Sequence, residues 1–219
     1  MVKKIEVSIS QSQHITNSYL IYDETKDAIL LDPGDEAQKI IDTINSLELK
    51  VKYICITHAH ADHMGALEKV LKYTNAKILI HENDVLALFN KIENYCDMLG
   101  VDKQNISKDV VIEIVDGYEF SVGNLKFEVI HTPGHTSGSI CIFEKTSNML
   151  FTGDTIFSDC YGRCDLQTGS IDKMVSSINK LFLRFSNIEI YPGHNMSVNI
   201  DEAKKKIRLL LAMKGIALK

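Results

Sequence analysis

Short runs of apolar residues, some alternating with polar ones, recur along the chain and predict β-strands. Apolar and polar positions alternate in residues 2–9, whereas residues 51–57 are mostly apolar. The three prolines, Pro33, Pro133 and Pro192, are each followed by a glycine and indicate turns after strands. The predicted strands are residues 2–9, 17–23, 28–32, 51–57, 76–80, 125–130, 139–144, 149–152 and 188–191.

Apolar residues three and four positions apart predict helices between these strands. Residues 36–47 are an example, with isoleucine or leucine at positions 40, 41, 44 and 47. Residues 91–108 fit neither pattern. The predicted helices are residues 36–47, 66–73, 84–90, 171–185 and 201–213. Strand-rich blocks with interspersed helices occur twice, which predicts an α/β protein with two sheets covered by helices.

The composition of the chain limits the classes of protein to which it can belong. The 219 residues are 45% hydrophobic and no linker or short repeat interrupts them, so we expect one domain over residues 1–219. The net charge is −5 and the densest basic run, residues 204–206, lies in a predicted helix, so we expect no nucleic-acid partner. The N-terminus alternates in polarity and no apolar run is long enough to cross a bilayer. We therefore expect no signal peptide and no membrane partner.

The cysteines indicate a cellular compartment. Their number, five, is odd and their spacing is scattered, which favours a reducing cytosol over a disulfide framework and predicts a cytoplasmic location. Cys55 lies inside a predicted strand and is expected in the core. Cys160 and Cys164 are expected to be unpaired thiols.

One segment, ITHAHADHMGA at residues 56–66, crowds four polar side chains into six positions directly after a predicted strand. These side chains are His58, His60, Asp62 and His63. Later histidines and an aspartate also follow predicted strands, at positions 131, 135, 154 and 194. A rigid sheet can hold side chains at its strand ends precisely enough for chemistry, so we expect these residues to form a site.

The residue types in this segment favour metal binding, because imidazole and carboxylate are good ligands for zinc and similar ions. Such a short loop cannot easily aim all four at one ion, but it can aim two pairs at two adjacent ions. His135, Asp154 and His194 could complete both sets, with Asp154 shared between ions about 3.5–4 Å apart. The pattern His-x-His-x-Asp-His should arise by chance in about one such chain in a thousand.

Three further histidines are interpreted differently. His14 and His81 are isolated, and each is expected to be a surface or internally satisfied histidine. His131 could be a ligand in place of His135, although we favour a role in orienting a loop or a ligand.

The sequence resembles the metallo-β-lactamase superfamily in four stretches: THAHADHMG at 57–65, HTPGHTSGS at 131–139, FTGDT at 151–155 and PGH at 192–194. The resemblance implies a four-layer αββα sandwich with a metal site at one edge of its two sheets. It also implies ligands for two divalent cations, zinc first, with iron or manganese as alternatives. His58, His60 and His135 would bind the first ion, Asp62, His63 and His194 would bind the second, and Asp154 would bridge both.

Within this superfamily the chain is similar to glyoxalase II-like hydrolases, the hydroxyacylglutathione hydrolases. The similarity lies in TPGHTSGS, in GDTIF and in GRCDL at residues 162–166. It implies cleavage of a small acyl or thioester substrate by a metal-bridging hydroxide. Asp62 would bind metal and orient that hydroxide, and Asp154 would bridge the ions, so both count as catalytic. Full-length glyoxalase II enzymes carry a further C-terminal helical domain that helps hold glutathione. We expect this chain to lack it, so another thiol or acyl compound is an open alternative.

Two residues of the loop after Asp154 are candidates for substrate contacts. Arg163 could meet an acidic group of the substrate, or it could form a loop-stabilising ion pair with Asp165. Tyr161 is expected to line the pocket. The pattern favours no particular oligomeric state.

Other functions fit parts of the pattern. A persulfide dioxygenase uses a single iron with two histidines and one aspartate, a role that His58, His135 and Asp154 could fill. Another hydrolase of the same fold could act on a lactone, a β-lactam or a phosphodiester, although the lack of a basic surface argues against a nuclease. A non-catalytic metal-binding module is disfavoured, because a two-metal ligand set exceeds what a structural site needs.

Overall fold

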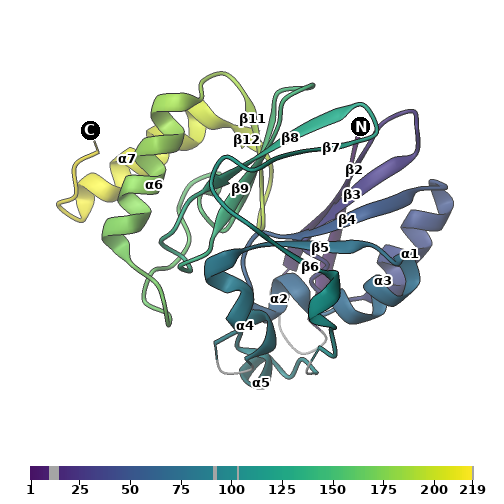
Figure 1. Ribbon diagram of the computed structural model, residues 1–219. Helices are drawn as coiled ribbons and strands as arrows, with labels where there is room; N and C mark the ends of the chain where they lie inside the picture. Colours follow the sequence, from purple (N-terminus) through teal and green to yellow (C-terminus); the bar gives the residue numbers. More distant parts are fainter. Residues whose placement is uncertain (10–14, 91–92, 103, 219) are drawn as a thin grey trace.

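Each half of the chain builds one six-stranded β-sheet, and the two sheets lie face to face (Figure 1). The computed structural model describes residues 1–9, 15–90, 93–102 and 104–218. The first sheet has the order β1-β2-β3-β4-β5-β6, antiparallel from β1 to β3 and parallel from β3 to β6. Its strands are β1 (Val2–Ser8), β2 (Ile15–Tyr22), β3 (Asp27–Leu31), β4 (Lys50–Ile56), β5 (Lys77–His81) and β6 (Val111–Ile114).

The second sheet has the order β12-β11-β10-β9-β8-β7. Its neighbours are antiparallel except for β10 and β11, which run parallel. The strands are β7 (Glu119–Val122), β8 (Leu125–His131), β9 (Ile140–Glu144), β10 (Met149–Gly153), β11 (Glu189–Pro192) and β12 (Val198–Asn199). The parallel pair makes β10 and β11 end at the same edge of this sheet.

Helices cover the outer face of each sheet (Figure 1). On the first sheet lie α1 (Ala37–Ser46), α2 (Ala61–Met64), α3 (Leu67–Thr74), α4 (Val85–Phe89) and α5 (Cys96–Leu99). Short 3₁₀ turns occupy Glu82–Asp84 and Lys108–Val110. On the second sheet lie α6 (Ile171–Arg184) and α7 (Ile200–Met213). The predicted αββα sandwich is confirmed.

Three apolar layers hold these elements together, because successive side chains of a strand point to opposite faces of its sheet. In β3, Leu30 packs under the helices of the first sheet, whereas Ile29 and Leu31 point between the sheets. Cys55 and Phe127 lie in that same central layer, as expected for Cys55. The third layer joins the second sheet to α6 and α7. Both faces of each sheet are thus buried, which fixes the strand ends rigidly.

All nine predicted strands and all five predicted helices are present, with boundaries within two residues. The pattern of apolar residues did not predict β6, β7, β12, α2 and α5, each of which has at most four residues. An element of that length seldom shows a clear periodic pattern. Within the described ranges, no helix combines the length and the apolar character that crossing a membrane would require.

Candidate metal centre

The ends of strands from both sheets converge on one place at the edge of the sandwich. His58 and His60 follow β4 of the first sheet. His135 follows β8 of the second sheet, and Asp154 and His194 follow β10 and β11. Asp62 and His63 were expected in a loop, but they lie in the single helical turn α2. This helical turn brings the side chains of both residues next to the candidate ligands at the strand ends.

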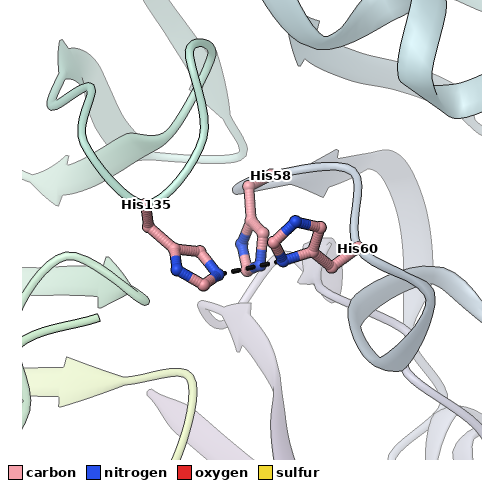
Figure 2. A group of neighbouring side chains, drawn as sticks. All are labelled: His58, His60 and His135. Atoms are coloured by element: carbon pink, nitrogen blue, oxygen red, sulfur yellow. Dashed lines mark hydrogen bonds between the residues drawn. The ribbon is translucent and has the colours of Figure 1, made fainter. Parts of the chain in front are cut away.

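The first group of candidate ligands is His58, His60 and His135. Their ligand atoms lie within 4.8 Å of one another and all three side chains are buried. Figure 2 shows the three imidazole rings facing one another, with Nε2 of His135 2.9 Å from Nδ1 of His60. The structure therefore brings together the three residues that the sequence assigned to the first ion.

The second group is Asp62, His63 and His194, whose ligand atoms also lie within 4.8 Å of one another. Asp154 lies between the two groups. Its carboxylate oxygens are 3.4 Å from Nε2 of His63, 3.4 Å from Nε2 of His194 and 3.6 Å from Nε2 of His135. Asp154 can therefore reach both sets of histidines, as a shared ligand must.

The hydrogen bonds of the rings show which nitrogen atoms are available for a metal. Nδ1 of His194 is 2.6 Å from the carbonyl oxygen of Ile15, and a carbonyl can only accept, so this nitrogen carries the proton. Nδ1 of His63 is 3.0 Å from a carboxylate oxygen of Asp32, with the same result. The Nε2 atoms of the two rings then face each other at 3.3 Å. Two neutral rings would oppose their lone pairs at this distance, and two protonated rings would oppose their charges, so a shared metal cation relieves the repulsion in either case.

Buried polar atoms without partners give the same indication. In the described part of the chain, Nε2 of His58, Nε2 of His60 and Oδ1 of Asp154 are buried and accept or donate no hydrogen bond. An orphaned buried polar atom costs about 1–3 kcal/mol. All three belong to the candidate ligands, so the residues present fit divalent cations, which would satisfy these atoms.

The electrostatics of the site divide its histidines into two kinds. Burial, together with neighbouring histidines, lowers the pKa of His58 well below its usual range and that of His60 to about 3, so both are neutral and able to bind metal. Burial also lowers the pKa of His63 and His194, but the carboxylates of Asp154 and Asp62 outweigh it and raise these pKa values to about 9 and 11. The site as a whole thus attracts positive charge.

Asp32 supports the second group, a role that the sequence analysis did not assign. Its carboxylate accepts hydrogen bonds from the backbone N–H and the hydroxyl of Thr57, both at 2.7 Å, and it contacts His63. A carboxylate behind a histidine ligand fixes the orientation of its ring. Asp32 directly follows a strand, as the candidate ligands do, and this position was the available signal.

Asp84 supports the first group. One carboxylate oxygen accepts hydrogen bonds from the N–H of Ala59 at 3.1 Å and from the hydroxyl of Thr136 at 2.8 Å. The other accepts from the N–H of Gly138 at 2.7 Å. Ala59 lies between His58 and His60, and Thr136 follows His135. Asp84 therefore ties together the two loops that carry the first group.

The two other described histidines, His81 and His131, are outside the groups of candidate ligands. His131 stacks on His81 with ring centroids 3.9 Å apart, and its Nε2 is 2.9 Å from the carbonyl oxygen of Ser137. His81 is buried and its Nδ1 accepts a hydrogen bond from the N–H of Asn83, so it is internally satisfied. Neither ring belongs to a group of candidate ligands. His14 lies outside the described residues.

A cavity of about 300 Å³ opens over the candidate ligands. Arg163 lines it, and its guanidinium makes two 2.8 Å hydrogen bonds to the carboxylate of Asp165, so the ion pair that was one of the two alternatives for Arg163 is present. Tyr161 is not among the described residues that line the cavity, because its hydroxyl is turned to Lys214 Nζ at 3.0 Å. Tyr95, which the sequence analysis did not single out, lines the cavity instead.

The two cysteines near the cavity are free thiols, as expected. Burial raises the pKa of both Cys160 and Cys164 to about 11. Both side chains are therefore protonated at neutral pH and are poor nucleophiles.

Comparison with known proteins agrees with this geometry. The family model described as the metallo-beta-lactamase superfamily matches residues 12–194. The chain belongs to the metallo-β-lactamase superfamily, and the site it forms is that of a metal-dependent hydrolase.

Individual relatives are similar over most of their length. Hydroxyacylglutathione hydrolase GloC of Haemophilus influenzae is 30% identical over 190 residues, covering 86% of this chain and 90% of the relative. A probable polyketide biosynthesis zinc-dependent hydrolase, PksB of Bacillus subtilis, is also 30% identical and covers 81% of this chain and 72% of the relative. The crystal structure of the B3 metallo-β-lactamase BLEG-1 superimposes with a TM-score of 0.87 at 27% identity, covering 96% of this chain and 99% of that one.

Proposed function

We propose that this protein is a binuclear metal-dependent hydrolase that cleaves a thioester. The observation that carries the proposal is the pair of three-residue ligand groups with Asp154 between them. His58, His60 and His135 would hold one ion, and Asp62, His63 and His194 the other. The similarity to a hydroxyacylglutathione hydrolase supports a thioester as the substrate, and a relative named as zinc-dependent supports zinc.

Two cations bound at these positions would supply a water of lowered pKa and an electrophilic contact for the substrate carbonyl. The residues of the chain supply the placement. Backbone carbonyls of Arg163 and Ile15 hold Nδ1 of His135 and His194, so that Nε2 of each ring points to the centre. Asp62 lines the cavity, and in this proposal it would accept a hydrogen bond from the attacking water. A thiolate is a good leaving group, so no separate proton donor is required.

The test is a hydrolysis assay with measured metal content. The metal content of the protein as isolated is measured first. Samples loaded with Zn²⁺ or with Fe²⁺ are then offered thioesters of glutathione and of other thiols, with a β-lactam and a persulfide as comparison substrates and with oxygen uptake recorded in parallel. We expect two metal ions per chain, release of free thiol and no oxygen uptake. One iron per chain with oxygen consumption would overturn the proposal in favour of a dioxygenase. Cleavage of the β-lactam without cleavage of any thioester would show that the proposed substrate class is wrong.

A further inference from the structure

One side of the cavity over the candidate ligands is apolar. Two segments form it: the α5 segment contributes Tyr95, Met98 and Leu99, and the loop after β10 contributes Phe157 and Leu166. A 2.8 Å hydrogen bond from the N–H of Gln167 to the hydroxyl of Tyr95 joins the two segments. We call these five side chains the apolar wall.

The apolar wall adjoins the candidate ligands on both sides. The ring of Tyr95 meets that of His60 edge-on at 5.1 Å, and the ring of Phe157 lies 6.0 Å from that of His194. A group bound against the wall would therefore lie next to the position where the reacting bond must be held.

The exposure of Met98 is the strongest indication that the apolar wall binds a ligand. Its side chain is 71% exposed although it is apolar, whereas its neighbour Leu99 packs against the core of the first sheet. A flexible methionine exposed at the mouth of a concave site is typical of a surface that adapts to an apolar ligand.

The charged residues that line the cavity also favour an apolar ligand. Arg163 is the only lysine or arginine among the described residues that line it, and its guanidinium is already paired with Asp165. Asp62 and Asp154 also line the cavity and would be taken up by cations. The lining therefore offers much apolar contact and little free positive charge for an anionic substituent.

We propose that the apolar wall binds an uncharged apolar group of the substrate, directly beside the scissile bond. The inference rests on the proposed thioester hydrolysis and adds the substrate class: a thioester with an aliphatic or aromatic substituent on its acyl or its thiol side. The volume, about 300 Å³, is at the small end of ligand sites and limits the group to a short chain or one ring.

Two substrate series test this proposal with the metal-loaded protein. In one series the thiol is constant and the acyl group is acetyl, butanoyl, hexanoyl, benzoyl or succinyl. In the other the acyl group is acetyl and the thiol varies in the same way. We expect kcat/KM to rise with apolar length in one series, by up to about fourfold for each buried methylene, and to fall for the carboxylated member. The series that responds identifies the side of the bond that meets the wall. Flat profiles in both series would overturn the inference but leave the proposed function intact.

A pair of methionine variants distinguishes an effect of the apolar wall on substrate preference from the effect of adding a charge anywhere on the surface. Met98→Lys should flatten the length dependence and improve succinyl relative to hexanoyl substrates, because it places a cation in the wall. Met213→Lys is the matched control, since Met213 is 78% exposed at the end of α7 and is absent from the lining. Equal profiles for the two variants would contradict the assignment of Met98.

Binding of simple carboxylates gives a readout that needs no turnover. Calorimetry should show hexanoate binding to the metal-loaded protein at least tenfold more tightly than acetate, and Met98→Lys should narrow this ratio. Equal affinities for the two carboxylates would refute binding at the apolar wall even if no thioester were cleaved. A tenfold preference for hexanoate without thioester cleavage would refute only the proposed function.

Discussion

Asp154 is the residue at which the two halves of the candidate site meet. Its carboxylate is buried, has one oxygen without a partner in the described structure, and lies within 3.6 Å of three histidine side chains. His58 occupies a similar position among the histidines, since its ligand atom lies within 4.8 Å of those of His60 and His135 and also within 4.8 Å of those of His63 and Asp154.

Replacing either residue should therefore affect both ions. We expect His58→Ala and Asp154→Ala to lose at least one metal ion per chain and to lower kcat/KM by at least about a hundredfold, a loss of roughly 2.7 kcal/mol in transition-state stabilisation. Metal analysis and the hydrolysis assay measure the two effects in the same sample. Asp102→Ala, at an exposed position outside the ligand groups, is the control. Full metal content with full turnover in either ligand variant would refute the site.

A second prediction for a single residue concerns Asp84, whose carboxylate joins the loop of His58 and His60 to the loop of His135. Asp84→Asn keeps the shape but replaces one acceptor oxygen by a donor. We expect the affinity for the first ion to fall by about 10- to 100-fold, with the second ion less affected. Titration of the metal-free protein with Zn²⁺ in competition with a chelator measures both affinities.

The exposed Asp102→Asn serves as the control for a change of charge. A purely structural role for Asp84 would instead lower stability and leave both Zn²⁺ affinities unchanged.

At the scale of elements, the bend that carries His194 is held by a strand of the other sheet. Asn17 of β2 donates from its backbone N–H to Gly193 at 2.7 Å and from its side chain to Pro192 at 2.9 Å and Asn195 at 2.8 Å. The hydroxyl of Tyr19 donates to the same carbonyl of Pro192 at 2.8 Å. The position of the last candidate ligand thus depends on the contact between the two sheets.

The contact between β8 and α6 gives a prediction about pH. The guanidinium of Arg184 binds the carboxylate of Glu128 through two hydrogen bonds of 2.7 and 2.8 Å, and Lys145 lies 3.1 Å away. The hydrogen bond from Arg184, assisted by Lys145, lowers the pKa of Glu128 from 4.5 to about 2. Since the folded-state pKa is depressed, the stabilisation is complete above the ordinary pKa and is lost as the pH falls from about 4.5 towards 2.

Glu128→Gln should therefore lower the free energy of unfolding at neutral pH by about 1 kcal/mol, because solvent screens part of the pair. The difference from the parent protein should shrink as the pH falls through this window. Urea unfolding followed by circular dichroism across the pH range measures it. Glu113→Gln, at an exposed position of β6, is the control and should show no such convergence. A difference for Glu128→Gln that is independent of pH would contradict the assignment.

For the whole molecule, binding of metal should stabilise the sandwich, because the ligands come from both sheets. At a free Zn²⁺ concentration about a hundredfold above the Kd, the gain is about 2.7 kcal/mol per site. Thermal unfolding with and without a chelator measures this difference. The His58→Ala variant should respond less to the chelator than the parent protein. An unfolding midpoint that does not change on removal of metal would show that the ligands are not assembled as described.

The sequence predicted the candidate ligands because each follows a predicted strand, and because four of them stand close together in residues 58–63. Asp84 could not be found in this way. Asp32 also comes at the end of a strand, but no histidine stands near it in the sequence to mark it as part of the site. Asp84 lies 25 and 52 positions from Ala59 and Thr136, so its hydrogen bonds depend on how the two halves pack. The same reason explains why Tyr161 was expected at the cavity that Tyr95 lines, since α5 has no periodic pattern that would place it there.

The division of the candidate ligands between the two halves of the chain has a consequence for biosynthesis. His58, His60, Asp62 and His63 emerge from the ribosome well before His135, Asp154 and His194. A nascent chain therefore passes through a stage in which it exposes four of these seven side chains without the rest of either ligand set. The proposed first ligand set is complete once Asp154 has been synthesised, whereas the second also needs His194, so occupation of both sites would have to await the docking of β10 and β11.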